Sequence, residues 1–464
     1  MLFNSFAYAL FLPAVAIAYF ALPQRWRWLL LLVASCGFYM AFVPVFILIL
    51  AFTILVDYAA GILIEGASGS ARRAWLTASI AANVSVLAAF KYFNFFSANA
   101  TALLHLFGAG ATLPLLHLVL PIGLSFHTFQ SMSYTIEVYR GSQPAERHLG
   151  IFALYVMFFP QLVAGPIERP QNLLPQLRRE ARFDAVRTVS GLRLILWGLF
   201  KKIAIADALA PAVDLAYGNP GGYSGGALLM ATYFFSLQIY CDFSGYSDVA
   251  IGSARILGIE LMRNFDHPYE AASVPGFWRR WHMSLSTWFR DYVYFPLGGG
   301  RRHKRRNLVI VFLLSGLWHG ANWTFVIWGA LHAAYMVAHD FVAAPKTQLG
   351  RALRVLLTFH LVAFAWVFFR APSLGSAAFI LSRIPRLRPG AGDWLLGMYW
   401  YQLLPIGAAV AVLLLTEWRP AREVLLRLFP AAPRPLRYCV YYAGALAVLF
   451  SSAGAPRQFI YFQF

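Results

Sequence analysis

The sequence predicts an all-α, polytopic membrane protein of about eleven transmembrane helices, with additional re-entrant and interfacial helices. Of its 464 residues, 60% are hydrophobic and 12% are charged, whereas a soluble domain usually carries about 25% charged residues. The mean hydropathy is +0.61. Hydrophobic runs recur along the chain, several of them short or broken by Gly and Pro, at 5–22, 28–43, 45–64, 75–94, 115–135, 149–165, 188–209, 225–241, 307–325, 326–345, 352–370, 400–416 and 437–453.

The net charge of +19 fits a membrane topology better than a nucleic-acid partner. Lys and Arg gather in a few connections, and the positive-inside rule places such connections in the cytoplasm. The first span would then run inward, with the N-terminus outside. These loops are expected to meet anionic lipid, and the alternative is that one of them also binds the phosphates of a cytoplasmic substrate. The basic connections are 25–27, 72–73, 140–147, 169–193 and 301–306.

Features near the N-terminus and along the polar stretches favour one integral membrane domain over residues 1–464. No basic region precedes the first hydrophobic run, and no small-residue cleavage site follows Ala21, so we expect a retained first span. The stretches 166–187 and 259–306 are rich in aromatic residues and arginine, which is typical of segments at the headgroup level. Prolines divide FFPQLVAGPIERP into pieces too short to span, which predicts a re-entrant segment there.

The stretch SGLWHGANWTFVIWGALHAAY, residues 315–335, holds the strongest chemical candidate. Gly316 and Gly320 flank Trp318 and His319, and small residues let a backbone approach a neighbour closely. Three indoles in this stretch would wall a narrow tunnel around His319, which we place on a tight turn. A histidine at membrane depth is a functional hypothesis by default. The alternative is a buried histidine satisfied by a backbone carbonyl.

A second histidine, His282, lies in FWRRWHMSLSTWF. Plotted as one helix, this stretch has a broad aromatic and leucine face opposite Arg279 and Arg280, which predicts an amphipathic helix near the cytoplasmic surface. His282 falls between the two faces. It would either point into the protein and contact substrate or extend toward the headgroups.

Two further stretches carry polar groups in apolar surroundings. In QIYCDFSGYSDVAIGSARILGI, Asp242 and Asp248 need partners, and Arg255 is available. We expect the helix to break at Gly245, with Ser244 or Ser247 capping the next helix. The C-terminal FIYFQF is either an interfacial anchor or a tail tucked into the protein with the Tyr461 hydroxyl near the reaction site.

Several familiar chemistries are disfavoured. The sequence contains no HExxH, CxxC, glycine-rich phosphate loop or GxSxG. Its cysteines, Cys36, Cys241 and Cys439, are scattered and give neither a disulfide framework nor a metal knuckle. No carboxylate or cysteine at ligand spacing accompanies His319 and His332, so we predict no metal site.

These motifs together resemble the membrane-bound O-acyltransferase family, in its bacterial alginate O-acetylation-like branch. The resemblance runs from MLFNSFAYALFLP to FIYFQF and is most specific at QIYCDFSGYSDVAIG, FWRRWHMSLSTWFRDYVYFPLGG and SGLWHG. It implies a bundle of about eleven spans around a central funnel or tunnel. His319 matches the family's catalytic histidine, and His282 its second polar active-site residue. We expect substrate contacts from Trp318, Asp242, Arg279, Arg280 and Tyr461.

The resemblance also implies an activity. Such enzymes take an acyl group from a cytoplasmic thioester, here expected to be acetyl-CoA with no bound cofactor, and deliver it across the inner membrane. The acceptor would be a secreted polysaccharide such as alginate, reached with a periplasmic SGNH-type transferase and a polysaccharide synthase complex. The alternatives are D-alanyl transfer to a cell-envelope polymer, a transporter and a scaffold. Neutral His319 suits a general base, and His282 or the Trp318 N–H an oxyanion donor.

Overall fold

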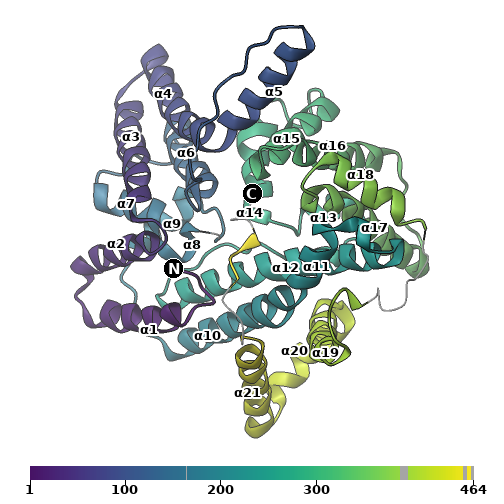
Figure 1. The fold of residues 1–464 in the computed structure, drawn as a ribbon. Coiled ribbons are helices and arrows are strands. Elements are labelled where there is room, and N and C mark those ends of the chain that lie inside the picture. The colour runs from purple at the N-terminus through teal and green to yellow at the C-terminus, as the bar shows by residue number, and fades with distance from the viewer. Residues whose placement is uncertain (164, 387–394, 453–456, 461–464) are drawn as a thin grey trace. The chain divides into compact units, whose positions relative to one another are not determined.

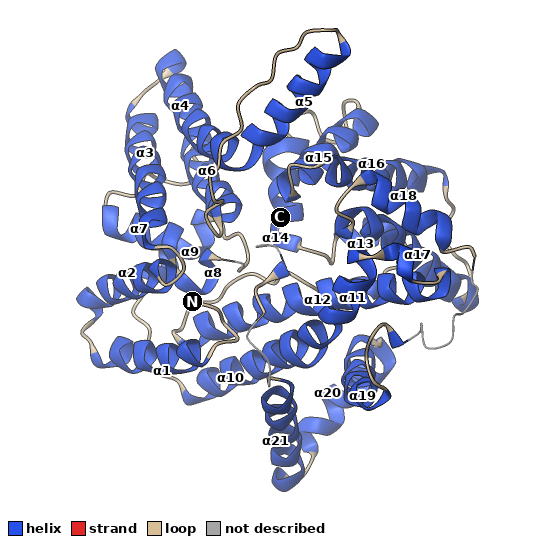
Figure 2. Cartoon of the chain, viewed as in Figure 1, coloured by secondary structure: helices blue, strands red, loops and turns tan. Residues whose placement is uncertain are grey.

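Helices and connecting loops make up the whole of the computed structural model at residues 1–163, 165–386, 395–452 and 457–460, which are the residues it describes (Figure 2). No strand occurs within these ranges. The prediction of an all-α protein is therefore confirmed. Figure 1 shows the order of the helices along the chain.

The first of two compact units comprises Met1–Leu192 and Ala250–Met262. Helices α3, α4 and α6 pack together in it around a fully buried carboxylate, Asp57. The Ser79 hydroxyl donates to Asp57 Oδ1 at 2.6 Å, and Asn83 Nδ2 donates to both oxygens. These hydrogen bonds satisfy a group whose burial would otherwise be costly. The helices of this unit are α1 (Phe6–Ala21), α2 (Gln24–Met40), α3 (Ile47–Gly66), α4 (Gly69–Leu87), α5 (Phe93–Leu106), α6 (Leu124–Arg140), α7 (Leu149–Met157), α8 (Phe159–Leu162), α9 (Pro170–Arg178) and the first part of α10 (Ala185–Leu199).

The second unit comprises Arg193–Val249 and Arg263–Phe464. Two π-helical turns interrupt its α-helices, η3 (Phe200–Asp207) and η6 (Arg290–Tyr294). Such turns are rare in proteins, and those that occur often lie at functional sites. The expectation of one domain over residues 1–464 stays a prediction. The remaining helices of this unit are α11 (Ala208–Gly218), most of α12 (Gly225–Ile256), α13 (Val274–Trp278), α14 (Met283–Phe289), α15 (Lys304–His319), α16 (Trp323–Ala338), α17 (Gln348–Arg370), α18 (Leu374–Arg383), α19 (Trp400–Glu417), α20 (Arg419–Ala431) and α21 (Arg434–Ser451).

Side-chain caps define where several helices begin. Ser5 accepts a hydrogen bond from the N–H of Tyr8 at the start of α1, and Thr347 accepts one from the N–H of Gly350 at the start of α17. Asn322 does the same for α16 through the N–H of Thr324. Each cap satisfies one of the N–H groups that a helix start leaves without an intrahelical partner.

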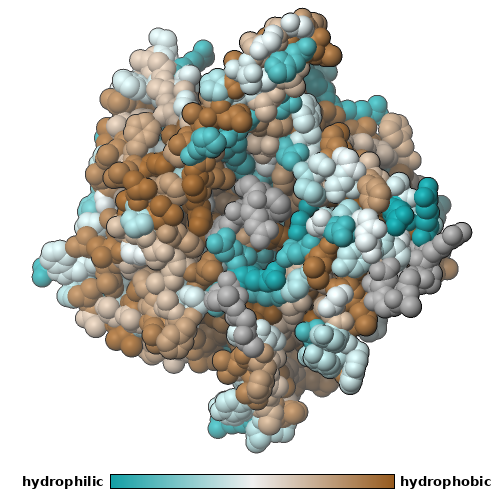
Figure 3. Space-filling model, viewed as in Figure 1, coloured by the Kyte–Doolittle hydropathy of each residue, from teal (hydrophilic) through white to brown (hydrophobic). Residues whose placement is uncertain are grey.

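Exposed apolar side chains mark the chain as a multi-pass membrane protein. Hydrophobic residues cover large parts of the face seen in Figure 3, and Phe6 and Ile17 of α1 are 78% and 72% exposed. Soluble monomers rarely expose contiguous apolar areas of this extent. By length and composition, four helical stretches among the described residues are able to cross a bilayer, and the count of eleven stays a prediction. These four are Pro44–Gly66, Gly69–Leu106, Gln348–Arg370 and Trp400–Glu417.

Proline decides where two of the predicted hydrophobic runs form helix. Residues 107–123, which include the first part of the predicted 115–135 run, lie outside helices, and α6 begins only after Gly123. Pro114 and Pro121 explain this difference, because proline removes a backbone donor and restricts the residue before it. The predicted run at 149–165 is divided as expected, since α7 ends at Met157 and the short α8 has Pro160 in its first turn.

Candidate active site

His319 is the last residue of α15, at the corner of a helical hairpin formed by α15 and α16. The two backbones are in close contact. A methyl group added at Gly316 would lie 2.3 Å from the carbonyl oxygen of Phe325, and one added at Gly329 would lie 2.3 Å from that of Phe312. The predicted close approach at Gly316 is therefore confirmed. Extended backbone at Gly320 then turns the chain into α16.

Aromatic rings surround His319, whose exposed fraction is 4%. The ring centroids of Trp318, Trp328 and Phe369 lie 4.9, 5.0 and 5.3 Å from that of the imidazole. The third predicted indole, Trp323, is 50% exposed. The wall around His319 is thus built from two of the predicted indoles and from a phenylalanine of α17.

His282 does not lie within one amphipathic helix, and that prediction is wrong. Helix α13 ends at Trp278 and α14 begins at Met283, with His282 between them in the left-handed conformation (φ 43°, ψ 54°). The imidazole points inward at this break, as the complete burial of His282 shows. Its ring centroid lies 6.1 Å from that of Trp318, which also contacts His319. One indole therefore contacts both candidate histidines.

Asn264 holds this break in place, and sequence reasoning missed it. The residue is 1% exposed. Its Oδ1 lies 3.1 Å from Nδ1 of His282, and it accepts hydrogen bonds from the hydroxyl and the N–H of Ser284. Its backbone carbonyl accepts the N–H of Met283 at 2.9 Å. The only sequence signal was an amide residue in the stretch 259–306, which was predicted to lie at the headgroup level.

The two arginines near His282 in sequence lie in the same break between α13 and α14 but, unlike it, are not buried. Arg279 is exposed, and Arg280 is half-buried. Arg280 Nη1 lies 3.8 Å from a carboxylate oxygen of Glu270 and donates to the carbonyl of His267 at 3.4 Å. Their predicted substrate contacts stay predictions.

A buried ionic network lies on η3 and α12, and its partners differ from those expected. Lys202 Nζ lies 2.7 Å from both Asp207 Oδ1 and Asp242 Oδ1. Lys201 pairs with Asp248 at 2.8 Å. The expected partner, Arg255, instead binds Glu260. Two consecutive lysines of η3 thus neutralise the buried aspartates.

Helix α12 continues through Gly245, so the predicted break and the new serine cap are also wrong. A methyl group added at Gly198 would lie 2.6 Å from the carbonyl oxygen of Gly245. Here glycine serves close helix packing rather than a turn. Ser244, one of the proposed caps, instead accepts a hydrogen bond from Lys201 Nζ at 2.9 Å.

The described residues 457–460 near the end of the chain are tucked into this unit. Phe459 is fully buried, and Ile460 is 3% exposed. The N–H of Ile460 donates to Asp242 Oδ2 at 2.7 Å, and the Phe459 ring packs against Tyr246 and Phe243 with centroid distances of 4.6 and 5.3 Å. The described part of the tail therefore matches the tucked interpretation. Tyr461 lies outside the described residues.

A continuous series of ring contacts connects this tail to both histidines. Phe243 contacts Phe459 and also His282, with a centroid distance of 4.5 Å to the imidazole. His282 leads on to Trp318 and His319 through the contacts given above. Of the predicted site residues, the structure thus brings together His319, His282 and Trp318, with Asp242 one step removed through the tail.

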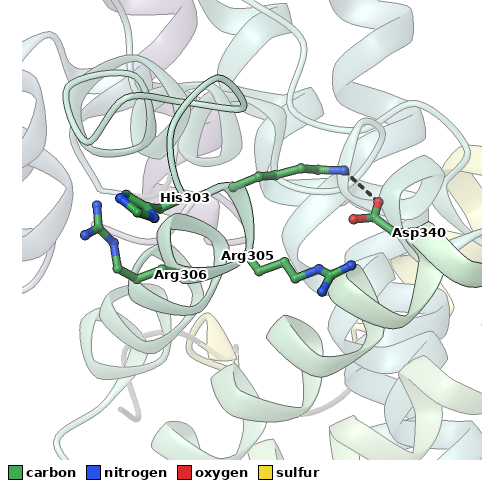
Figure 4. Close-up of a pocket in the computed structure, with 5 residues that line it drawn as sticks. His303, Arg305, Arg306 and Asp340 are labelled. Carbon is green, nitrogen blue, oxygen red and sulfur yellow. Dashed lines mark hydrogen bonds and ion pairs between the residues drawn. The ribbon is translucent and has the colours of Figure 1, made fainter.

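A basic pocket lies at the start of α15 (Figure 4). It is lined by His303, Lys304, Arg305, Arg306 and Asp340. Lys304 Nζ lies 2.6 Å from Asp340 Oδ1 and holds the pKa of that exposed carboxyl below its ordinary value. The pocket belongs to the predicted basic connection 301–306. Among the described residues, no group of three His, Cys, Asp or Glu side chains is placed to hold a metal ion.

Comparison with known proteins shows the family to which the chain belongs. The family model described as MBOAT, membrane-bound O-acyltransferase family, matches residues 148–370. A probable alginate O-acetylase of Azotobacter vinelandii is 42% identical, covering 85% of this chain and 79% of that protein. A peptidoglycan O-acetyltransferase of Helicobacter pylori is 35% identical, covering 82% and 79%. A teichoic acid D-alanyltransferase of Bacillus subtilis is 29% identical, covering 53% and 68%. The chain belongs to the membrane-bound O-acyltransferase family and is an O-acyltransferase.

Proposed function

We propose that this enzyme moves an acetyl group from acetyl-CoA, at the cytoplasmic side of the inner membrane, toward a secreted polysaccharide such as alginate. The observation that carries the proposal is the pair of buried histidines, His319 and His282, in contact with one indole, Trp318. The similarity to an alginate O-acetylase over most of both chains supports the acetyl group and the polymer.

In the proposed reaction His319 acts as the general base. Its imidazole takes the proton of an acceptor hydroxyl while the hydroxyl oxygen bonds to the thioester carbonyl carbon. The carbon–sulfur bond then breaks, and the thiolate of coenzyme A receives the proton, so that an acetyl ester and a free thiol are formed. A positioned base contributes about 10²–10⁴-fold in rate. The Trp318 N–H is a donor suited to the oxyanion between these steps.

The basic pocket of His303, Arg305 and Arg306 supports a donor that carries phosphates. Arginine side chains bind phosphate oxygens in pairs and stay charged at all working pH values. The Arg305 guanidinium also lies over the Phe341 ring, 4.8 Å from its centroid, which places an aromatic surface beside the charge. We propose that this pocket receives the nucleotide end of acetyl-CoA on the cytoplasmic side.

The buried tail suggests how the acetyl group continues. We propose that Tyr461, the residue after the buried Ile460, accepts the acetyl group or passes it to a periplasmic SGNH-type transferase that serves a polysaccharide synthase complex. A separate acceptor protein is expected because the large polymer has to be reached outside the membrane. The similarity to a D-alanyltransferase favours a second candidate, transfer of a D-alanyl group to a cell-envelope polymer. A transporter or a scaffold would need neither histidine.

The test compares acetylation of the polymer in a deletion strain that expresses the wild type, His319→Ala, His282→Ala or Tyr461→Phe at matched levels. His332→Gln is the matched control, since His332 is a buried histidine of the same unit that accepts a hydrogen bond from Trp278. We expect loss of acetyl ester in both alanine variants and retention in the control. Full acetylation in His319→Ala and His282→Ala would overturn the proposal, and unchanged acetylation in Tyr461→Phe would remove the relay alone.

Membrane vesicles identify the donor. Vesicles containing the wild type should release free coenzyme A from labelled acetyl-CoA in step with labelled ester, and His319→Ala vesicles should not. Transfer from a D-alanyl carrier protein in place of acetyl-CoA would instead support the second candidate.

A further inference from the structure

We infer that Asn264 is a positioning residue that fixes the proton of His282 on Nδ1, so that this histidine presents an unprotonated Nε2 to the site. The inference rests on the proposed function, because it concerns how one histidine of that site works. Asn264 lies outside the sequence motifs that resemble the family.

The orientation of the Asn264 amide follows from its neighbours. The backbone N–H of Ser284 can only donate, and it points at the Asn264 side chain with a nitrogen–oxygen distance of 3.3 Å. The Ser284 hydroxyl lies 2.9 Å from the same atom. That atom must therefore be the amide oxygen, since a backbone donor cannot bond to an NH₂ group. The amide nitrogen is then left to donate to the Ser247 hydroxyl, at 3.2 Å.

The tautomer of His282 follows from this orientation. His282 Nδ1 lies 3.1 Å from the Asn264 oxygen, which has no proton to give. Nδ1 must then carry the hydrogen and donate it, because a bare nitrogen facing a carbonyl oxygen would place two lone pairs against each other. A neutral imidazole carries one ring proton, so Nε2 is the acceptor.

Backbone contacts make the arrangement rigid. The left-handed conformation of His282 is unfavourable for a residue other than glycine and persists only where the surroundings enforce it. Asn264 enforces it with two hydrogen bonds. Its backbone carbonyl accepts one from the N–H of Met283, and its amide oxygen accepts one from the N–H of Ser284. The residue that orients the imidazole thus also holds the bend that turns it inward.

The consequence is a division of roles within the proposed site. With Nε2 unprotonated, neutral His282 accepts a hydrogen bond from a substrate hydroxyl or N–H and cannot donate one to an oxyanion. Of the two oxyanion donors that the sequence left open, the indole N–H of Trp318 is then the one that fits, because it can only donate. His282 is assigned to orient or deprotonate the hydroxyl beside His319.

The decisive experiment is nitrogen NMR on histidine-labelled enzyme in lipid bilayers, with the His282 signals identified by their loss in His282→Gln. We expect Nδ1 protonated and Nε2 bare in the wild type. Asn264→Leu, which removes the acceptor at similar volume, should lose this preference and lower kcat about 10–100-fold, with little change in the KM for acetyl-CoA. Ser247→Ala is the matched control, because it removes the partner of the Asn264 amide nitrogen but leaves the amide oxygen in place.

A second variant keeps the test valid if Asn264→Leu fails to fold. Asn264→Asp retains an acceptor oxygen and adds a negative charge beside His282, which favours the imidazolium. If activity needs neutral His282, the acidic limb of the pH–rate profile should then shift to higher pH. A proton on Nε2 in the wild type, or a wild-type tautomer and rate in Asn264→Leu, would overturn the inference. Because the NMR needs no turnover, it reports on Asn264 even if acetyl-CoA is not the donor.

Discussion

Replacing Lys202 by methionine removes the cation shared by two carboxylates, and we expect a large loss of stability. The side chains of Lys202 and Asp242 are 3% and 4% exposed, and that of Asp207 is 17% exposed. Removing one partner from a buried ion pair costs about 3–5 kcal/mol, because a charge is left without compensation. At about 2–4 °C per kcal/mol for a unit of this size, the midpoint of thermal unfolding should fall by about 6–20 °C.

The assay is thermal unfolding in a fixed detergent, with Lys304→Met as the matched control. Lys304 carries the same substitution at an exposed pair with Asp340, so water replaces the lost contact and the midpoint should change little. The double variant Lys202→Met/Asp242→Asn should recover part of the loss, since it removes one of the two stranded charges.

The same substitution should release the C-terminal tail. Asp242 holds the N–H of Ile460, and Lys202 Nζ also lies 3.4 Å from the carbonyl of Gln458. A cysteine at position 460 should therefore resist maleimide in the wild-type background, with Cys439 replaced by serine, and react faster once Lys202 is methionine. If Lys202→Met unfolded at the same temperature as Lys304→Met and left residue 460 protected, the network would not hold the tail.

Two other predictions test the hairpin and the basic pocket. Gly316→Ala should lower both stability and acyl transfer, because the added methyl meets a carbonyl oxygen of α16 and displaces His319, at a packing cost of about 1–3 kcal/mol. Gly407→Ala, which adds a methyl to open space on α19, should leave both unchanged, and equal effects would refute the argument. Asp340→Asn should lower the KM for acetyl-CoA by removing an anion from the pocket. Lys304 keeps the pKa of Asp340 below its ordinary value, so the difference in KM between Asp340→Asn and the wild type should persist to acidic pH and vanish only as the carboxyl protonates. If Asp340→Asn left the KM for acetyl-CoA unchanged at low salt, the donor would bind elsewhere.

The membrane class and the close packing of the hairpin formed by α15 and α16 were predictable because the sequence signals for them are local. Span-length apolar runs follow from composition alone, and glycines spaced around His319 indicate close packing within one hairpin. Where proline interrupts an apolar run, hydropathy overestimated the helix, as at 115–123.

The break at His282 was not predictable from its own neighbourhood. No glycine or proline lies between Trp278 and Met283, so the helical pattern seemed continuous. The left-handed residue is instead held by Asn264, which is 18 positions earlier in the chain. A tertiary hydrogen bond overrides local propensity here, and a single sequence contains no pattern that reveals it.

The ionic network shows the same limit for charges. Asp242 and Asp248 had a candidate partner in Arg255 on the same helix, yet their partners are lysines of η3. Sequence proximity favoured Arg255. Burial decided otherwise, because a buried carboxylate needs a cation at the same depth, and the π-helical turn brings two consecutive lysines there.

The position of Asp242 changes how its predicted role should be interpreted. Both carboxylate oxygens are engaged within the protein, one by Lys202 and one by the N–H of Ile460. A carboxylate held in this way acts on the site through the tail. Phe459 of the tail contacts Phe243, and Phe243 contacts His282. Asp242→Asn keeps an acceptor for Ile460 but removes the charge that holds Lys202, whose Nζ lies 3.4 Å from the carbonyl of Gln458 in the tail. We therefore expect it to lower kcat through loss of the ordered tail while leaving the KM for acetyl-CoA near its wild-type value, whereas a residue that grips the donor would raise that KM.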